Sequence, residues 1–566
     1  MFALEPMEPG VIDAPWLASY PSGVPATIDP DAHPSLHALL LAACRRHADR
    51  PAFDFLGAVM SYAEWDRASA AFAGFLRETL GRAAGERVAI MLPNVLAYPV
   101  AFLGTLRAGL TVVGVNPLYT PRELAHQLVD SGATTIVIME NFAHKLAGVI
   151  AQTSVDHVVV VRLGDLVPTF KRWAFNFANT YLRHAVPAWQ FDRFTMMQDA
   201  CVRPPSRPLP DPSAPPATPA LLQYTGGTTG VAKGAVLSHR NLVANTLQCA
   251  AWIGPTVAPG VERVLTPLPL YHIFSLTANM LTFASLGGLN VLVTDPRDIR
   301  RLIATMRRTQ PTAMSGVNTL FNALANAPEF AALDFSALKF AIGGGAAVQS
   351  SVAERWQALT GTALVEGYGL TEASPVACIN PVLRPRPGTV GLPVPSTEVS
   401  IRDDLGHPLG VGQMGEVWVR GPQVMQGYFG RPDETRRTLD RDGWLLTGDL
   451  GVIDAEGFVK LVDRKKDMII VSGFKVFPNE VEDVIAQHPG VLEAAVIGVP
   501  DPRSGQAVKL FVVRRDPALT EAQVRAYCHD NLTAYKVPRL IEFRDVLPKS
   551  NIGKILRKEL QASSGT

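Results

Sequence analysis

The segment Tyr224–Gly234 concentrates residue types that bind anions. It reads YTGGTTGVAKG and holds four glycines, three threonines and one lysine. Glycines let several backbone N–H groups converge on one oxyanion, and threonine hydroxyls and a lysine add further donors. The segment therefore predicts a phosphate-binding loop. Its expected binding residues are Thr225, Gly226, Gly227, Thr228, Thr229, Gly230 and Lys233.

This loop departs from the commonest phosphate-loop pattern. A Walker A loop places serine or threonine directly after its lysine, whereas Lys233 is followed by Gly234. The spacing also differs from the glycine patterns of kinases and dinucleotide-binding proteins. By these residues alone, a flexible surface loop stays open as the alternative, and no substrate is indicated.

The elements that must position such a loop follow an α/β pattern. Up to about residue 460, short runs of β-branched residues alternate with helical patterns, which predicts α/β layers with mostly parallel strands. The preceding LLQY is typical of a strand end. Further strands are expected to begin at Arg87, Ala133, His157, Arg263, Asn290 and Leu338.

The C-terminal part has a different pattern. It combines short strands with a helix opened by Pro478 and a second helix capped by Thr520. We therefore expect a large N-terminal domain, residues 1–463, of layered α/β subdomains. A small, mobile α+β domain, residues 464–566, would follow a polar hinge at 464–467.

Composition narrows the function classes. The 566 residues contain 52 Lys+Arg and 51 Asp+Glu, which disfavours a nucleic-acid partner held by a basic surface. Five scattered cysteines form no CxxC pair, so we expect a reducing compartment and no zinc site. The N-terminus lacks a signal-peptide pattern, and no apolar stretch reaches the ~20 residues of a membrane span. These features predict a cytoplasmic protein.

Residues 167–190 have two interpretations. The segment has no acidic residue and three Lys/Arg. Aromatic residues at helical spacing usually enter a core, and the residues favour that interpretation. The alternative is an interfacial helix that makes peripheral contact with the inner face of the cytoplasmic membrane. The aromatic residues concerned are Phe170, Trp173, Phe175, Phe177, Tyr181 and Trp189.

The loop and the sequence after it, YTGGTTGVAKGAVLSHRNL, resemble the phosphate-loop signature of the adenylate-forming superfamily. This superfamily includes acyl-CoA synthetases, luciferases and peptide-synthetase adenylation domains. Further matches follow in the family's order: PLPLYHIF (267–274), GGGAAV (343–348), EGYGLTEASP (366–375), GEVWVRGPQVMQGY (415–428), GWLLTGD (443–449), DRKKDMIIVSGFKVFPNEVE (463–482) and PKSNIGKILR (548–557).

The resemblance is strongest to bacterial long-chain fatty acid–CoA ligases. It extends to NPLYTPRELAHQL (116–128), GVNTLFNAL (316–324), ERWQALTG (354–361) and DGWLLTGDLGVIDAEGFVKLVDRKK (442–466). The chain departs from that subgroup at Leu446, where histidine is usual, and at Lys475 and Phe477, where asparagine and tyrosine are frequent. These departures concern acyl and CoA preference rather than the reaction class.

The resemblance implies a two-step ligation. A fatty acid carboxylate attacks the α-phosphorus of ATP, giving acyl-AMP and pyrophosphate, and the thiol of CoA then displaces AMP. The expected partners are fatty acid, ATP and CoA, with Mg²⁺ as a hard cation that prefers oxygen ligands. Because the first two partners are both anions, the site must supply concentrated positive charge.

The resemblance also implies roles for residues outside the loop. Lys554 would bridge the carboxylate and the α-phosphate, Thr371 would bond the α-phosphate, and Glu372 would bind Mg²⁺. Lys466 matches the hinge position. The expected ATP- and AMP-binding residues beyond the loop are Gly343, Gly344, Gly345, Glu366, Gly367, Tyr368, Gly369, Thr371, Asp449, Arg464 and Lys554, and those for CoA are Ser472, Gly473 and Phe474.

Some alternatives stay open. His272, within the apolar LYHIFSL, lies either at the carboxylate end of an acyl tunnel or in the core. Other functions to be weighed are a medium-chain or aryl acid–CoA ligase and a fatty acyl-AMP ligase that loads a carrier protein. A non-catalytic fatty-acid carrier or membrane tether is a further class, and a homodimer is an untested expectation.

Overall fold

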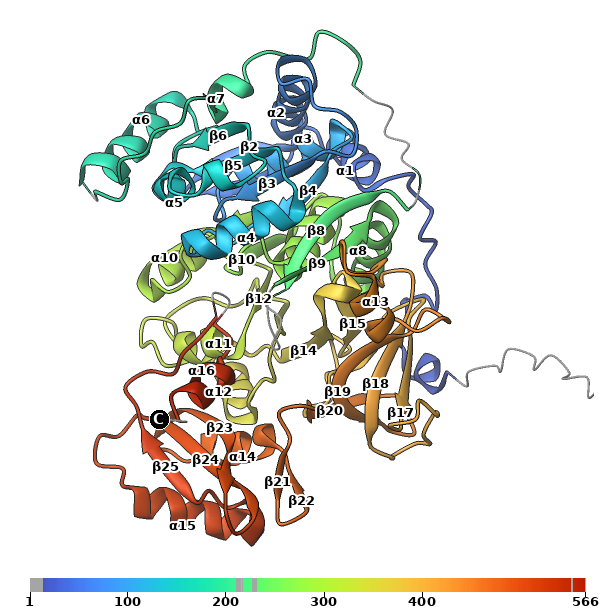
Figure 1. The fold of residues 1–566 in the computed structure, drawn as a ribbon, viewed down its shortest axis with the longest axis vertical. Coiled ribbons are helices and arrows are strands. Elements are labelled where there is room, and N and C mark those ends of the chain that lie inside the picture. The colour runs from blue at the N-terminus through green and yellow to red at the C-terminus, as the bar shows by residue number, and fades with distance from the viewer. Residues whose placement is uncertain are drawn as a thin grey trace, which may run out of the picture.

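The computed structural model describes residues 14–182, 184–209, 215, 217–225, 232–550 and 553–564 (Figure 1). Within these ranges the chain forms four β-sheets. Two large sheets and a smaller one make up the N-terminal part, and the fourth lies in the C-terminal part at the lower end of Figure 1. The phosphate-loop residues Gly226, Gly227, Thr228, Thr229 and Gly230 lie outside the described residues.

The first large sheet ends in the strands that flank the predicted phosphate loop. Its order is β7-β6-β5-β3-β4-β8-β9. All neighbours are parallel except the hairpin β8–β9. The strands are β3 (Arg87–Met91), β4 (Thr111–Gly114), β5 (Thr135–Met139), β6 (His157–Val161), β7 (Phe194–Met196), β8 (Pro219–Thr225) and β9 (Lys233–Ser238).

The second large sheet has a parallel centre with antiparallel strands at its edges. Its order is β16-β15-β14-β13-β12-β10-β11-β1-β2, and the run from β14 to β1 is parallel. The strands are β1 (Pro51–Phe55), β2 (Ala58–Ser61), β10 (Arg263–Thr266), β11 (Leu289–Leu292), β12 (Ala313–Gly316), β13 (Phe340–Gly343), β14 (Leu364–Gly369), β15 (Val376–Ile379) and β16 (Leu392–Pro393).

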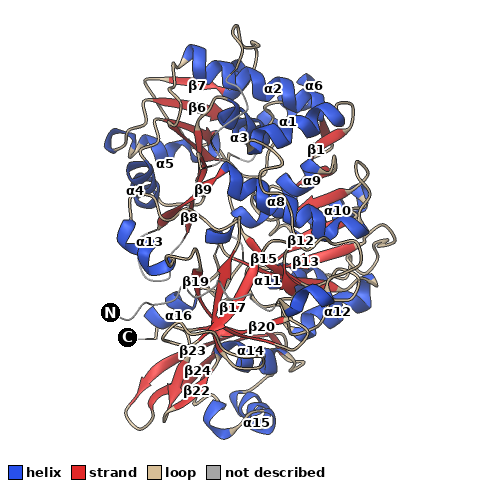
Figure 2. Ribbon diagram, turned by 90° about the vertical axis from the view of Figure 1, so that its right-hand side faces the viewer, coloured by secondary structure: helices blue, strands red, loops and turns tan. Residues whose placement is uncertain are grey.

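Helices cover both faces of the parallel strands, because each strand is apolar on its two sides. One core cluster joins residues of both large sheets to a shared helical layer between them (Figure 2). This layer contains α1 (Leu36–Arg46), α2 (Tyr62–Gly74), α3 (Ala97–Arg107), α8 (His239–Ile253) and α9 (Thr282–Ser285). The outer faces are covered by α4 (Pro121–Ser131) and α5 (Ala143–Ala147) on the first sheet and by α10 (Ile299–Thr309), α11 (Asn318–Ala325) and α12 (Ser350–Thr360) on the second.

The third sheet is antiparallel throughout, which the alternating pattern did not predict. It consists of β17 (Glu398–Arg402), β18 (Gly415–Arg420), β19 (Leu445–Ile453) and β20 (Val459–Arg464). A short hairpin joins β19 to β20, whereas the longer connection from β18 to β19 contains the helix α13 (Pro432–Thr438). A further short helix is α7 (Met197–Ala200).

The C-terminal part is an α+β unit, as expected. Its sheet order is β22-β21-β24-β23, with β25 paired to β24. Pro478 opens the first helix and the Thr520 side chain caps the second, which confirms both predictions. The elements are β21 (Ile469–Val471), β22 (Phe474–Val476), α14 (Pro478–Ala486), β23 (Val491–Asp501), β24 (Gly505–Arg514), α15 (Glu521–Asn531), β25 (Leu540–Phe543) and α16 (Arg557–Ala562).

The aromatic segment corrects the favoured interpretation. It forms α6 (Thr169–Phe177) and a π-helical turn (Ala178–Leu182), and most of its aromatics point outward rather than into the core. Phe170 is 84% exposed, Trp173 67% and Tyr181 64%. Phe175 packs inward, with its ring edge on Phe55. In the described part of the chain, no helix has the length and apolar character needed to cross a membrane.

Candidate active site

A cavity of about 1630 Å³ lies where the N-terminal sheets and the C-terminal unit meet. Ends of strands from both large sheets and from the third sheet line it, together with residues of the loop before α16. Open α/β sheets commonly bind ligands beyond the carboxyl ends of their strands. The cavity exceeds the few hundred to ~1,000 Å³ typical of a single small ligand, so it has room for more than one substrate.

Strands β8 and β9, which flank the predicted phosphate loop in the sequence, reach this cavity. Thr225 and Lys233 face each other across that hairpin, and both line the cavity. The ammonium of Lys233 forms an ion pair with Glu434 of α13 and lies 5.3 Å from the centre of the Tyr428 ring. An anion bound here would therefore have to draw Lys233 away from Glu434.

Tyr428 connects the phosphate-loop strand to Glu372. Its hydroxyl donates to the Glu372 carboxylate at 2.7 Å. Its chain segment runs along β9, where Val236 donates its N–H to the carbonyl of Gly427 at 2.9 Å and Phe429 donates to Gly234 at 2.8 Å. Tyr428 ends the family-like stretch GEVWVRGPQVMQGY, but nothing in the sequence indicated its contact with Glu372.

Glu372 provides one carboxylate oriented by a neighbouring hydroxyl. It lines the cavity beside Thr371 in the short helical turn Thr371–Ala373. Among the described residues, no group of three or more His, Cys, Asp or Glu side chains could hold a metal ion. Magnesium is commonly held by one or two carboxylates and by substrate phosphates, and this donor set fits that pattern.

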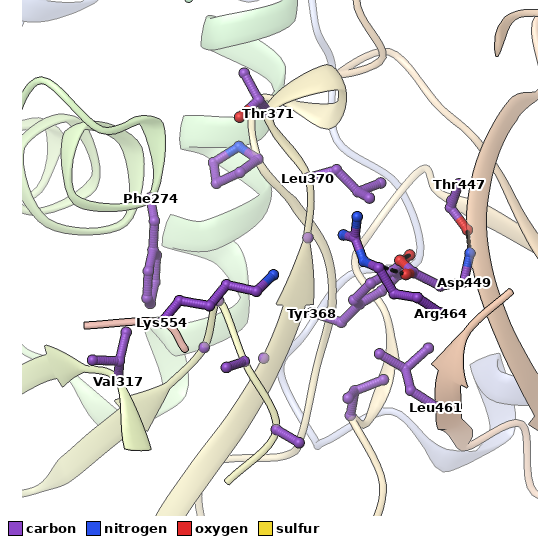
Figure 3. A pocket seen from close by; sticks show the side chains of 18 of the residues that line it. Phe274, Val317, Tyr368, Leu370, Thr371, Thr447, Asp449, Leu461, Arg464 and Lys554 are labelled. Atoms are coloured by element: carbon purple, nitrogen blue, oxygen red, sulfur yellow. Dashed lines mark hydrogen bonds and ion pairs between the residues drawn. The ribbon is translucent and has the colours of Figure 1, made fainter. Parts of the chain in front are cut away.

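Tyr368, Asp449 and Arg464 form a polar cluster at one wall of the cavity (Figure 3). The Tyr368 hydroxyl donates to Asp449 at 2.7 Å, and the Arg464 Nε lies 3.1 Å from the other carboxylate oxygen. Asp449 and Arg464 are register partners on β19 and β20. Burial, followed by the charge of Asp449, holds the pKa of Tyr368 well above its usual range.

Lys554 projects into the space opposite this cluster, close to Phe274 and Val317 (Figure 3). A small turn fixes its backbone, because Ser550 donates its N–H to the Lys554 carbonyl at 2.7 Å. Burial lowers the pKa of Lys554 to about 8, and the charge of Arg464 adds to that effect.

A contact from α11, a helix that covers the second large sheet, holds the loop that carries Lys554 in place. The Thr319 hydroxyl, on α11, donates to the Gly553 carbonyl at 3.0 Å. Gly553 has φ +83°, and an added Cβ there would lie 2.6 Å from the Thr319 hydroxyl oxygen. Both the backbone conformation and the close approach therefore favour glycine just before the lysine.

His272 lines the same cavity, near Lys554. Burial and the neighbouring ammonium lower the pKa of His272 to about 4, so the imidazole is neutral at physiological pH. A neutral ring can donate one hydrogen bond without adding a second positive charge. The structure thus favours the cavity position for this residue over a position in the closed core.

The glycine-rich turn after β13 divides into two parts. Gly344 and Gly345 line the cavity, as the resemblance implies, but Gly343 does not. A Cβ at Gly343 would lie 2.6 Å from the Val348 side chain, so close packing explains that glycine.

The strand after this turn brings Glu366, Gly367 and Gly369 to the cavity wall. Burial raises the pKa of Glu366 to about 7, and the nearby carboxylate of Asp483 adds to the shift. A Cβ at Gly369 would lie 2.1 Å from the Pro375 carbonyl oxygen, so the backbone requires glycine there.

One part of the cavity wall is apolar. It comes from α8, the π-helical segment Ser275–Leu281, α9 and β15. None of these side chains was identified from the sequence, because apolar residues on helices look the same whether they face a core or a cavity. The residues are Cys249, Ile253, Ala278, Phe283, Val376 and Ile379.

The residues expected to bind CoA lie elsewhere. Ser472, Gly473 and Phe474 form the tip of the β21–β22 hairpin, and none of the three lines the cavity. Phe474 is 56% exposed and stacks on Tyr535 at 4.8 Å between ring centres. Lys466 lies between β20 and β21 and lines the cavity. Of the described residues, the structure therefore brings the expected nucleotide residues other than Gly343 together at one cavity, and it leaves the expected CoA residues apart from them.

Comparisons with known proteins match nearly the whole chain. The family model "AMP-binding enzyme" matches residues 40–429, and "AMP-binding enzyme C-terminal domain" matches residues 480–554. A long-chain-fatty-acid–CoA ligase of Salmonella typhi is 53% identical over 547 residues, covering 96% of this chain and 97% of the relative. A ligase of the same name from Haemophilus influenzae is 45% identical over 550 residues, covering 96% and 98%.

Solved structures agree with this result. The crystal structure of the anthranilate CoA ligase AuaEII in complex with anthranoyl-AMP superposes with a TM-score of 0.84. It is 25% identical in sequence, and the match covers 95% of this chain and 99% of that one. The fold and the sequence comparisons therefore point to the same family.

Proposed function

The chain belongs to the AMP-binding enzyme family, and from that premise we propose that it is a long-chain fatty acid–CoA ligase. One observation carries the proposal beyond the family name. The Lys554 ammonium lies in one cavity with a polar wall formed by Tyr368, Asp449 and Arg464 and with a separate apolar wall. A cation between a nucleotide site and an apolar pocket suits the joining of a fatty acid to a nucleotide.

The reaction proceeds in two steps. The fatty acid carboxylate forms a bond to the α-phosphorus of ATP, and the bond from that phosphorus to the bridging oxygen breaks, releasing pyrophosphate. The CoA thiol, losing its proton, then forms a thioester with the acyl carbon while AMP leaves. Because the first step joins two anions, charge stabilisation by positioned cations is the main contribution that the protein makes.

Two positively charged groups approach the phosphates from opposite domains. The loop from Thr225 to Lys233 would hold the β- and γ-phosphates, once Lys233 exchanges Glu434 for them. Lys554 would bridge the carboxylate and the α-phosphate, with the Thr371 hydroxyl as a further donor. Glu372, oriented by the Tyr428 hydroxyl, would hold Mg²⁺, which when bound neutralises phosphate charge.

The nucleoside would lie against the polar wall. Asp449 would accept hydrogen bonds from the ribose hydroxyls, with Arg464 beside it, and Tyr368 would lie along the adenine. Gly344 and Gly345 leave room for the flat ring. Asp449 is already held on both oxygens by Tyr368 and Arg464, so it is fixed in orientation before ATP binds, which reduces the entropy lost on binding.

The acyl chain would extend from His272 along the apolar wall. Each buried CH₂ contributes ~0.8 kcal/mol, so eight additional carbons would contribute about 6 kcal/mol as an upper bound. The length of the acyl chain therefore changes the binding free energy enough to determine which acid is preferred.

A panel of acids tests this function. Purified protein with ATP, Mg²⁺ and CoA should form AMP and acyl-CoA faster with long-chain than with medium-chain fatty acids, because each added CH₂ that is buried strengthens binding. Medium-chain or aryl acids as the best substrates would replace the long-chain assignment with the corresponding ligase. Transfer to a carrier protein but not to CoA would indicate a fatty acyl-AMP ligase, and release of no pyrophosphate with any acid would leave a non-catalytic carrier.

The second step requires the small domain to move. We propose that it rotates about residues 464–467, with Lys466 as the hinge, and that Ser472, Gly473 and Phe474 then line the path of the CoA pantetheine. The position of the hinge supports this division into 1–463 and 464–566. Strand β20 ends at Arg464 in one sheet, and β21 begins at Ile469 in another.

The ligase also has a surface suited to an anionic membrane. The outward side chains of α6 and the following turn, Phe170, Trp173, Phe177, Tyr181 and Leu182, are 40–84% exposed. Trp173 stacks on Phe177 at 5.3 Å, and Phe177 lies 5.2 Å from Tyr181. Exposed apolar patches on a soluble surface commonly mark interaction sites, and aromatic side chains suit the lipid headgroup boundary.

Basic residues lie beside these aromatics. Lys171 of α6 donates to the Gly57 carbonyl at 2.7 Å, on the turn between β1 and β2. Arg308 of α10 binds Asp54 at the other end of that turn. α10 carries four exposed arginines and no acidic residue, and cations near an anionic leaflet each add roughly 1 kcal/mol of attraction. We therefore propose that the cytoplasmic enzyme makes peripheral contact with the inner face of the cytoplasmic membrane through 167–190.

Vesicle binding tests this surface. The double variant Phe170→Ser with Trp173→Ser should lose binding to phosphatidylglycerol vesicles in sedimentation but keep full activity on detergent-dispersed acid. Leu383→Ser with Leu405→Ser, two exposed leucines elsewhere, is the matched control. Equal binding by the two double variants would contradict the proposal. The homodimer stays a prediction, tested by the mass of the protein in solution.

A further inference from the structure

Arg557 is largely enclosed by side chains from both sides of the hinge. It is three residues beyond Lys554, and its side chain is 19% exposed. It donates to Asn479 at 2.6 Å and to Glu482 at 2.7 Å, both on α14 of the small domain. Its remaining nitrogen faces two carboxylates, Asp463 at 3.7 Å and Asp467 at 3.6 Å.

Those two carboxylates differ in the domain to which they belong. Asp467 is the last residue of the hinge 464–467 and follows Lys466, so we expect it to move with the small domain. Asp463 is the penultimate residue of β20, and it lies on the large-domain side of the hinge. A rotation about the hinge would therefore separate Arg557 from Asp463, while Arg557 would keep its contacts with Asp467, Glu482 and Asn479.

A second contact from the small domain reaches the same carboxylate. The backbone N–H of Asn479 donates to Asp463 at 2.8 Å. The Asp463 side chain is fully buried, with 0% of its surface exposed. A buried carboxylate without its partners is strongly unfavourable, so Asp463 favours the arrangement in which Arg557 and Asn479 reach it.

We propose that Asp463 is a positioning residue that holds the small domain in the adenylating arrangement. Arg557 and Asn479 bind it only when the short loop before α16 lies in the cleft, and this loop carries Lys554. The proposal rests on the proposed two-step function. In this account Asp463 touches neither substrate, and it acts on the first step by fixing where Lys554 lies.

Separate measurement of the two half-reactions distinguishes this positioning role from a general structural role, because a structural defect would lower both rates. Asp463→Asn keeps an acceptor for the Asn479 N–H but loses the charge that faces Arg557. We expect acid-dependent exchange of labelled pyrophosphate into ATP to fall about tenfold, because the negative charge that faces Arg557 at 3.7 Å is lost. Thiolysis of supplied acyl-AMP by CoA should stay the same or rise.

Asp467→Asn is the matched control, because that carboxylate lies at a similar distance from Arg557 but on the small-domain side. It should leave the ratio of the two half-reactions near that of the unmodified chain. Equal losses of both half-reactions in Asp463→Asn, or the same change of ratio in Asp467→Asn, would overturn the proposal.

Proteolysis tests the role of Asp463 without an activity assay, so it can be used even when a variant has little activity. Limited trypsin cleavage at Lys465 and Lys466 should be faster in Asp463→Asn than in Asp467→Asn. Both lysines are exposed in the structure, so cleavage depends on how readily the hinge backbone opens locally, and the contacts of Asp463 oppose that opening. Equal cleavage rates in the two variants would contradict the proposed positioning role of Asp463. An unmodified chain without pyrophosphate exchange would instead refute the two-step function, whatever the cleavage result.

Discussion

The cavity wall that is expected to bind the nucleotide and the β21–β22 hairpin that is expected to bind CoA differ in burial and in their position relative to the cavity. Tyr368, Asp449 and Arg464 are buried or half-buried, bonded to one another and directed at the same cavity as Lys554. Residues 472–474 of the β21–β22 hairpin are exposed and do not line that cavity, and the hairpin lies at the lower end of Figure 1. Tyr368, Asp449 and Arg464, which are expected to bind the nucleotide, are therefore assembled at the cavity, whereas the residues expected to bind CoA are not.

This difference fits the proposal that one cleft serves two reactions in turn. In that proposal Lys554 acts in the first step and residues 472–474 act in the second. A polar hinge allows one domain to present first one face and then the other. The predictions below test whether the two regions act in separate steps.

The largest effect is expected from Lys554→Ala. Removing a donor aimed at transition-state charge typically costs ~10²–10³ in rate, so pyrophosphate exchange should fall by that factor. Thiolysis of supplied acyl-AMP should be retained, because in the proposed rotation Lys554 leaves the cleft before that step. Lys558→Ala, an exposed lysine on α16, is the control. Equal loss of both half-reactions in Lys554→Ala would contradict the separation of roles.

Lys466→Pro is expected to have a smaller effect, and to reduce thiolysis rather than pyrophosphate exchange. Proline fixes φ at the hinge, so the domain should stay as the structure shows it and the CoA hairpin should not reach the thioester site. Thiolysis should fall by roughly 10²-fold, as misplacement of a reacting group can cost that much, while pyrophosphate exchange changes little. Lys466→Ala serves as the control, and a symmetric loss would argue against hinge motion.

The smallest expected effect is in the pH profile. Burial and Arg464 lower the pKa of Lys554 to about 8, and only the charged form attracts the two anions. As pH rises through about 8 the free enzyme loses this proton, so kcat/KM for ATP in adenylation should fall about tenfold per further pH unit. Bound triphosphate favours the ammonium form, so kcat should fall only at higher pH.

Thiolysis of supplied acyl-AMP should lack this alkaline fall, because Lys554 has no part in that step. A kcat/KM for adenylation that stays constant well above pH 9 would contradict the assignment.

Much of the fold could be predicted from local pattern. Apolar β-branched runs such as HVVVV became buried parallel strands, and Thr520 and Pro478 began the helices that they indicated. The antiparallel third sheet was missed although β17 and most of β18 alternate buried and half-buried residues. The two strands after them, β19 and β20, do not keep that alternation. The aromatics of α6 were misjudged because periodicity shows that a helix has an apolar face but not what covers that face.

The candidate site was predictable only where a residue type has one obvious chemistry. Lysines and carboxylates within family stretches, such as Lys554 and Asp449, were found, and the structure places them in one cavity. Tyr428 and Asp463 were not found, since their contacts come from segments far away in the sequence. Gly343 was assigned to the cavity because a run of three glycines does not show which of them faces it.

The most direct test of the account is exchange of labelled pyrophosphate into ATP without CoA. The account predicts exchange that depends on Mg²⁺ and on a long-chain fatty acid, because the cleft as it stands already assembles the groups for acyl-AMP formation. Absence of exchange with every carboxylic acid from about eight to about twenty carbons, a range in which each CH₂ adds ~0.8 kcal/mol of burial, would contradict it. So would exchange that begins only when CoA is added.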